Sequence, residues 1–139
     1  MPDPKPPLTA EIVWTEKLRF DVTTGNHAIV TDGDGEMGPS PMDLMASAVT
    51  GCMAIDVVSI LQKGRPPLQA LRASFSGERA AEPPRRFTAI TLHFHVTGAV
   101  PDEAVQRAID LSREKYCSVW HSMRQDIAFT ITFKVSPGV

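Results

Sequence analysis

The two cysteines, Cys52 and Cys117, are the side chains of this 139-residue chain best suited to chemistry. A single pair is too few for a secreted scaffold held by disulfides, yet it is enough for one redox couple. Cys52 lies in an apolar run, where a free cysteine usually packs as a small hydrophobic residue. A reactive thiolate there needs a cation from elsewhere in the fold, such as Arg19 or the arginines of loop 78–86.

Cys117 lies among polar and aromatic residues, either at a helix break or inside a helix. At a break, the free backbone N–H groups of the next turn would lower the pKa of its thiol. In a continuous helix, His121 would lie at i+4 and could serve as the base for a Cys117 nucleophile. These local arguments favour Cys117 mildly, because Asp56 lies one turn after Cys52 and opposes a thiolate there. We expect Asp56 to hold a salt bridge or a backbone hydrogen bond.

Metal and phosphate chemistry have less support. His93 and His95 have a metal-ligand spacing along a predicted strand, but no third ligand is evident and an exposed sheet face explains them. A metal centre would require one of these residues, or His121, to converge with a cysteine. The glycine loop at 32–36 is acidic and would repel phosphate, so we interpret it as a turn. We expect neither a metal nor a cofactor.

Composition narrows the possible partners. The 14 Lys and Arg nearly balance the 16 Asp and Glu, and this leaves no basic excess for nucleic acid. A hydrophobic content of 42% is ordinary for a single domain, expected over residues 1–139. Residues 1–8 are rich in proline and contain no apolar run, so we expect an extended arm rather than a signal peptide. We accordingly expect a cytoplasmic protein.

Hydrophobic periodicity indicates an α+β fold. Ser40 suits an N-cap, Pro41 the first helical position and Asp43 the capping-box position, so a helix is expected from there to about Leu61. A second helix begins near 101, and its phase is expected to break near Cys117. Its inner side is expected to carry Val105, Ala108, Ser112, Tyr116 and Val119. Two-residue alternation predicts the strands, at 9–14, 18–22, 27–31, 68–76, 87–97 and 127–135. The resulting β-β-β-α-β-β-α-β order favours a mainly antiparallel sheet packed with helices on one face.

The helix over 44–61 is apolar on almost every side. Its borderline length and the central Asp56 argue against a membrane span. One sheet face and one further helix cannot cover it in a chain of this size. Dimerisation around this helix would cover the rest of its surface.

Both cysteine segments resemble those of the OsmC/Ohr family, and more closely its YhfA-type branch than the organic hydroperoxide resistance branch. The resemblance extends from Trp14 to Val135. It implies intertwined homodimers of β3-α-β2-α-β subunits with a buried central helix, and two active sites at the dimer interface. The matching segments are Gly38-Pro-Ser-Pro-Met-Asp-Leu44, Thr50-Gly-Cys52, Asp56-Val-Val-Ser-Ile-Leu61 and Lys115-Tyr-Cys-Ser-Val119.

The resemblance further implies a thiol-dependent peroxidase acting on organic hydroperoxides or hydrogen peroxide. Cys52 matches the peroxidatic cysteine and Cys117 the resolving cysteine that condenses with its sulfenic acid. An external dithiol, of lipoyl type in the hydroperoxide branch, would reset the pair. Arg19 matches the catalytic arginine. In the hydroperoxide branch a glutamate holds this arginine. Its position is occupied here by Met42, and Asp43, one residue later, is the acid expected in the catalytic site.

A non-enzymatic module is the alternative interpretation. In that case the pocket of the same fold holds a small apolar or electrophilic ligand, and the cysteines pack or sense redox state. Sulfur atoms far apart, with no cation near Cys52 and a closed apolar pocket, would favour this module over the peroxidase, because a disulfide requires bonding distance.

Overall fold

The computed structural model describes residues 4–64 and 66–138. The chain divides into two compact units, one ending at Met45 and the other beginning at Ala46. The predicted order of strands and helices is confirmed, and so is the α+β class. The strands form two separate three-stranded sheets. Residues 4–8 of the expected arm are exposed and lack regular secondary structure, whereas residues 1–3 lie outside the described residues. The single domain expected over 1–139 stays a prediction.

The first unit contains an antiparallel sheet in the order β1-β2-β3. Trp14 pairs with Phe20 across the first ladder, and Val22 pairs with Ile29 across the second. Several of its apolar side chains are exposed, among them Trp14 at 65% and Ile29 at 45%. The alternation therefore predicts the strands correctly, but the sheet leaves apolar surface uncovered. Its strands are β1 (Glu11–Glu16), β2 (Arg19–Thr24) and β3 (His27–Asp32).

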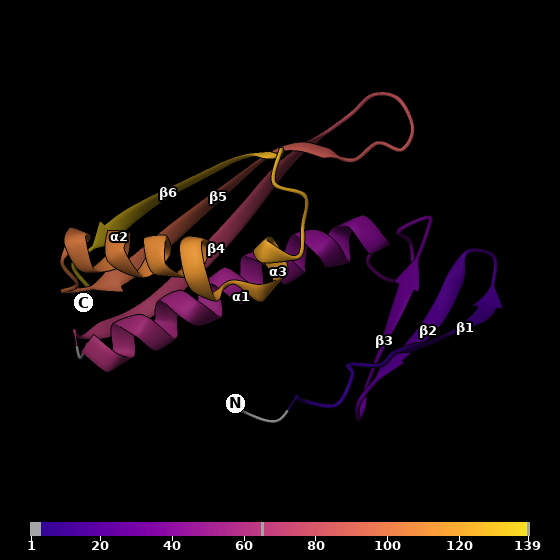
Figure 1. Cartoon of the computed structure of the whole chain (residues 1–139), viewed down its shortest axis with the longest axis horizontal. Helices are drawn as coiled ribbons and strands as arrows, with labels where there is room; N and C mark the ends of the chain where they lie inside the picture. Colours follow the sequence, from indigo (N-terminus) through magenta and orange to yellow (C-terminus); the bar gives the residue numbers. More distant parts are fainter. Residues whose placement is uncertain (1–3, 65, 139) are drawn as a thin grey trace. The chain divides into compact units, whose positions relative to one another are not determined.

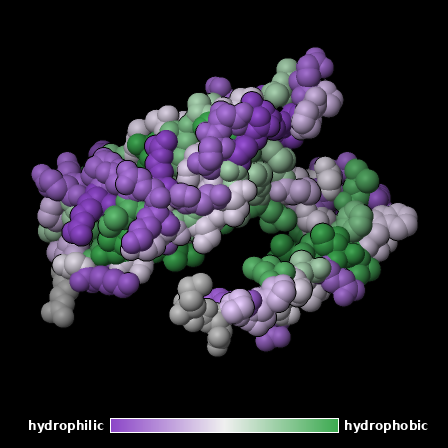
Figure 2. Space-filling view, viewed as in Figure 1, coloured by the Kyte–Doolittle hydropathy of each residue, from purple (hydrophilic) through white to green (hydrophobic). Residues whose placement is uncertain are grey.

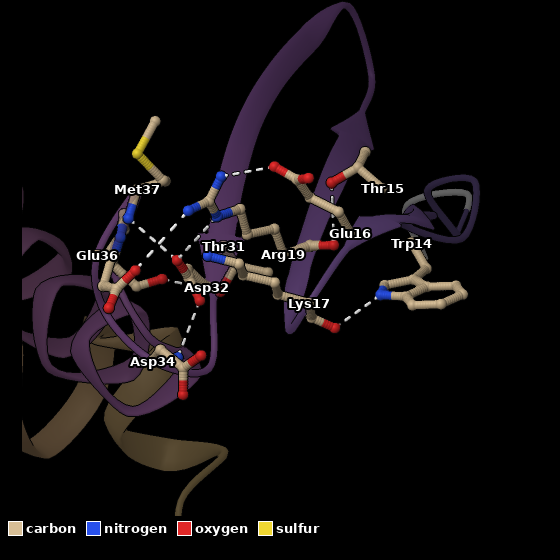
Figure 3. Close-up of polar contacts among 11 residues, drawn as sticks. Trp14, Thr15, Glu16, Lys17, Arg19, Thr31, Asp32, Asp34, Glu36 and Met37 are labelled. Atoms are coloured by element: carbon tan, nitrogen blue, oxygen red, sulfur yellow. Dashed lines mark hydrogen bonds and ion pairs between the residues drawn. The ribbon is translucent and has the colours of Figure 1, made fainter.

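Asp32, the last residue of β3, organises the acidic loop that follows. Its buried carboxylate accepts hydrogen bonds from the backbone N–H groups of Asp34, at 2.9 Å, and Met37, at 3.0 Å (Figure 3). These donors hold the pKa of Asp32 below its usual value, because they stabilise the charged carboxylate. The interpretation of the loop as a turn agrees with this geometry, and Gly35 supplies a positive φ of 70° within it.

Helix α1 (Pro41–Gly64) begins in the first unit and continues into the second. The predicted capping box is confirmed. The backbone N–H of Ser40 donates to the Asp43 carboxylate at 3.0 Å, and the backbone N–H of Asp43 donates to the Ser40 hydroxyl at 3.2 Å. The box satisfies donors that the first helical turn would otherwise leave unpaired.

The second unit builds the other sheet and carries the remaining helical segments. Figure 1 shows α1 and α2 on the same side of this sheet. Strand β4 pairs antiparallel with β5, but β6 pairs parallel with β5 because the chain crosses over through helical segments between them. The elements after α1 are β4 (Leu68–Arg79), β5 (Phe87–Gly98), α2 (Asp102–Leu111), the π-helical turn η1 (Ser112–Tyr116), α3 (Ser118–His121) and β6 (Ala128–Ser136).

Within one chain, α1 is buried along a single stripe. Its buried residues recur every four positions and comprise Val49, Met53, Val57 and Leu61. Ile55, on another face, is 70% exposed. By length and composition α1 would also pass as a membrane span, a test that the core helix of a soluble protein passes equally. A single subunit therefore buries only part of the apolar surface that the sequence of α1 provides.

Replacing Asp32 with Asn should reduce stability at neutral pH, because a neutral amide is a weaker acceptor for the two loop N–H groups. Since the pKa of Asp32 is lowered in the folded protein, its contribution is present above the unfolded value near 3.8 and is lost as the pH falls below it. Urea unfolding of the wild-type protein and the Asp32→Asn variant, at matched concentration, should therefore differ at pH 7, and the difference should shrink as the pH falls below 3.8.

The Asp34→Asn variant is the matched control, since Asp34 is an exposed acidic residue of the same loop. Its stability should follow the wild-type pH profile. If Asp32→Asn and Asp34→Asn had the same profile, the loop would not depend on the Asp32 carboxylate.

Candidate functional site

Cys117 lies at a break between two helical segments, as the first of the two alternatives predicts. It has an extended backbone (φ −74°, ψ 96°) between η1 and α3, and its Sγ accepts the backbone N–H of Trp120 at 3.4 Å. The continuous-helix alternative is wrong. The Nε2 atom of His121 instead lies 2.9 Å from the carbonyl oxygen of Arg113.

The second unit brings Cys52, Asp56 and Cys117 together. Their two Sγ atoms and one carboxylate oxygen all lie within 4.8 Å of one another. Cys52 and Asp56 are four residues apart and therefore share one face of α1, whereas Cys117 comes from the break that faces it. Both cysteines are free thiols. Cys52 is half-buried and Cys117 is fully buried, so the two sulfurs differ in access to solvent.

Asp56 is held by a residue that the sequence does not single out as functional. The hydroxyl of Ser112 donates to Oδ2 of Asp56 at 2.8 Å, and Ser112 is fully buried. The expected salt bridge or backbone hydrogen bond is thus replaced by a side-chain hydroxyl. In the sequence, Ser112 is distinguished only as a polar residue on the predicted inner face of the second helix.

Burial raises the pKa of the Cys117 thiol from 9.0 to about 11. The Trp120 N–H at the helix break lowers this pKa, as expected, but nearby Cys52 and Asp56 raise it further. The expectation that the helix break activates Cys117 is therefore wrong, because loss of solvent outweighs one weak hydrogen bond to sulfur. At neutral pH Cys117 is a thiol.

A cavity of about 490 Å³ adjoins the three-residue cluster, because Asp56 lines both. Two cationic side chains, Lys63 and Arg107, contribute to its wall, together with the apolar Ile60 and Leu111. The cavity therefore combines charge of both signs with apolar surface next to the half-buried cluster.

Arg19 and Asp43 belong to the first unit, whereas both cysteines belong to the second. Arg19 lies among three carboxylates, at 2.8 Å from Glu16, 3.5 Å from Asp32 and 3.7 Å from Glu36 (Figure 3). Its Nε is buried without a hydrogen-bond partner. Asp43 closes the capping box at the start of α1. The catalytic roles expected of these two residues stay predictions.

The histidines considered as metal ligands are held by hydroxyl groups of β6. The Nδ1 of His93 lies 2.8 Å from the Thr132 hydroxyl, and the Nε2 of His95 lies 2.8 Å from that of Ser136. Among residues 4–64 and 66–138, the grouping of three side chains that could hold a metal ion is instead the cysteine pair with Asp56.

Comparisons with known proteins agree with this architecture. The family model described as "OsmC-like protein" matches residues 32–132. Protein YhfA of Escherichia coli (strain K12) is 45% identical over 131 residues, which cover 92% of this chain and 98% of that protein. A hypothetical protein from Aquifex aeolicus VF5 has a solved structure with a TM-score of 0.88 at 26% identity, covering 95% of this chain and 98% of that one.

A more distant solved structure is described as an organic hydroperoxide resistance protein OsmC from Legionella pneumophila. It has a TM-score of 0.71 at 15% identity and covers 96% of this chain and all (100%) of that chain, which is a likeness of fold. The family match and the YhfA relative each extend over most of the sequence and agree with the resemblance carried by the two cysteine segments. The chain belongs to the family of OsmC-like proteins.

Proposed function

We propose that this protein is a thiol-dependent peroxidase that reduces organic hydroperoxides or hydrogen peroxide through Cys52 and Cys117. The observation that carries the proposal is the proximity of the two sulfur atoms, which lie within 4.8 Å of one another in one compact unit. A disulfide bond is about 2.05 Å long, so an approach of less than about 3 Å would join them.

Burial and the pKa of Cys117 support different roles for the two thiols. Cys52 is half-buried and can meet a dissolved peroxide, whereas Cys117 is fully buried. With a pKa of about 11, Cys117 remains protonated at neutral pH and is a poor first nucleophile. Attack on the peroxide therefore falls to Cys52, and Cys117 serves as the resolving thiol.

The reaction then takes two balanced steps. The Cys52 thiolate attacks one oxygen of the peroxide, so that an S–O bond forms, the O–O bond breaks and the leaving alkoxide takes a proton to become an alcohol. The sulfur of Cys117 next attacks the sulfenic acid of Cys52. An S–S bond forms, the S–O bond breaks, and the hydroxyl leaves as water with the proton of Cys117.

The disulfide must be reduced by an external dithiol before another turnover. We propose a dithiol of lipoyl type, on the strength of the resemblance to the hydroperoxide branch. Cys52 is the sulfur that such a reductant can reach, because Cys117 has no exposed surface. The cytoplasm is the fitting compartment, because its reducing thiol pool keeps an unpaired cysteine couple reduced.

The separation of the sulfurs discriminates against the non-enzymatic module. Cysteines that serve only as packing residues have no need to converge with each other and with a carboxylate. The distance of at most 4.8 Å therefore favours redox chemistry over ligand binding with inert thiols.

We also propose that the protein acts as an intertwined homodimer. Ile55 on α1 is 70% exposed, and Ile12 and Trp14 on β1 are 58% and 65% exposed. Figure 2 shows hydrophobic residues gathered on the visible surface of the part of the chain labelled β1–β3 in Figure 1. A three-stranded sheet needs a covered apolar face to be stable, and a second copy offers matching apolar surface.

The cysteine roles predict distinct masses after peroxide treatment. One equivalent of an organic hydroperoxide should remove two hydrogens from the reduced wild-type protein. Cys117→Ser should instead gain one oxygen, since its sulfenic acid has no partner. Cys52→Ser should lose peroxidase turnover by at least about two orders of magnitude, since it lacks the nucleophile. Intact-mass spectrometry and a coupled turnover assay measure these outcomes; an unchanged wild-type mass would refute the peroxidase.

The raised pKa of Cys117 predicts an order of alkylation. At pH 7 to 8, iodoacetamide should label Cys52 before Cys117, and labelling of Cys117 should rise toward pH 11. The raised pKa of Cys117 also makes the stability of the folded protein depend on pH. The neutral thiol contributes stability below about pH 9, and this contribution is lost as the pH rises toward 11. Peptide mapping reports the labelling order, and preferential labelling of Cys117 at pH 7 would reverse the assigned roles.

The homodimer predicts sensitivity at Ile55. Light scattering should give the mass of two chains for the wild-type protein. Ile55→Asp should shift that mass toward one chain, because a charge cannot be buried in an apolar interface without a partner. Ile55→Leu preserves the apolar volume and should remain dimeric. A wild-type mass of one chain at micromolar concentration would refute the dimer.

A further inference from the structure

Asp56 has no part in the peroxidase chemistry proposed above. It is half-buried, and one of its carboxylate oxygens lies within 4.8 Å of both sulfur atoms. The two sulfurs and this carboxylate oxygen are all donor atoms that a divalent cation can bind, and they lie close enough together to share one ion.

We propose that Cys52, Asp56 and Cys117 form a binding site for one Zn²⁺ ion. Two thiolates and a carboxylate suit Zn²⁺, whereas Mg²⁺ and Ca²⁺ prefer oxygen ligands alone. Binding to the reduced pair forms two S–Zn bonds and one O–Zn bond, and each thiol releases its proton to solvent. No electron is transferred in this step. The proposal goes beyond the peroxidase and does not depend on it.

The geometry of the cluster fits such an ion. With Zn–S bonds of about 2.3 Å and tetrahedral angles, two zinc-bound sulfurs lie about 3.8 Å apart. The donor atoms already lie within 4.8 Å of one another, so an approach of about 1 Å is enough. Cys52 and Asp56 have the i, i+4 spacing that lets one helix supply two ligands on one face. Cys117 supplies the third ligand from the opposing segment.

Ser112 supports the carboxylate ligand with a hydrogen bond. Its buried hydroxyl donates to Oδ2 of Asp56 at 2.8 Å and thereby orients the carboxylate. Metal-binding carboxylates are commonly held by outer hydrogen bonds of this kind. Three protein ligands leave the fourth tetrahedral position for water, as in zinc sites that are open to solvent. The cavity lined by Asp56 offers a path for that water.

The metal itself provides the test. The full-length protein, reduced and freed of metal by a chelator under anaerobic conditions, is titrated with Co²⁺ and then with Zn²⁺. We expect one equivalent of Co²⁺ per chain, with thiolate-to-cobalt charge-transfer absorption and the visible bands of a tetrahedral ion, all displaced by Zn²⁺. The charge-transfer absorption should weaken or vanish in Cys52→Ser and Cys117→Ser. Absence of this absorption in the wild-type protein would overturn the proposal.

Two further variants test whether Asp56 and Ser112 contribute to zinc binding or whether the two cysteines bind the ion alone. Asp56→Ala removes a ligand, and Ser112→Ala removes only its support, so the latter should weaken Zn²⁺ affinity by about tenfold and the former by more. Asp110→Asn is the matched control, because Asp110 is an exposed carboxylate of α2, and its affinity should equal that of the wild-type protein. Circular dichroism checks that each variant is folded. Wild-type affinity in folded Asp56→Ala would overturn the proposed ligand set.

The peroxide experiment, run with excess chelator, tests the peroxidase proposal without interference from bound metal. If the metal-free protein forms the disulfide but binds no Co²⁺, the peroxidase proposal stands and the zinc site is refuted. If the protein binds one Co²⁺ through both thiols but does not react with peroxide, the zinc site stands and the peroxidase is refuted. When both hold, disulfide formation should release the ion, since it removes two of the three ligands.

Discussion

The interruption of the helix between Ser112 and Cys117 is the constraint on which the candidate site depends. In η1 the backbone N–H of Cys117 donates to the carbonyl of Ser112, five residues earlier, rather than four. This wider turn ends the helix and leaves Cys117 extended. As a result, Ser112 bonds to Asp56 and Cys117 lies beside Cys52. In a regular α-helix, the side chains of Ser112 and Cys117 would lie on different faces. Such π-helical turns occur frequently at functional sites.

Local patterns predict much of the fold because they arise from local physics. Alternation identifies the strands, and the capping box at Ser40 and Asp43 marks the start of α1. The division of the strands between two sheets and the parallel pairing of β6 depend on contacts between distant segments. Tyr116, placed on the inner face of the second helix by its periodicity, is 48% exposed because η1 changes the helical phase.

The candidate site shows the same difference between local patterns and contacts between distant segments. Both cysteines are evident in the sequence, and a helix break at Cys117 is one of its two alternatives, but the protonation state of Cys117 cannot be predicted from the sequence. The N–H donor at the break is a local feature, whereas complete burial is a property of the folded chain and has the larger effect on the thiol. Ser112 is a similar case, since nothing in its immediate neighbourhood indicates Asp56, 56 positions away, as its partner. Sequence motifs thus identify the reactive atoms, and tertiary burial differentiates them.

The order of strands in the second sheet bears on how the protein folds. β5 lies between β4, its antiparallel partner, and β6, its parallel partner. A parallel partner can join only through a crossover connection, and such long-range pairings form slowly. Cys117 lies in this crossover, between η1 and α3. The folding step that completes the sheet is therefore also the step that brings Cys117 to its buried position.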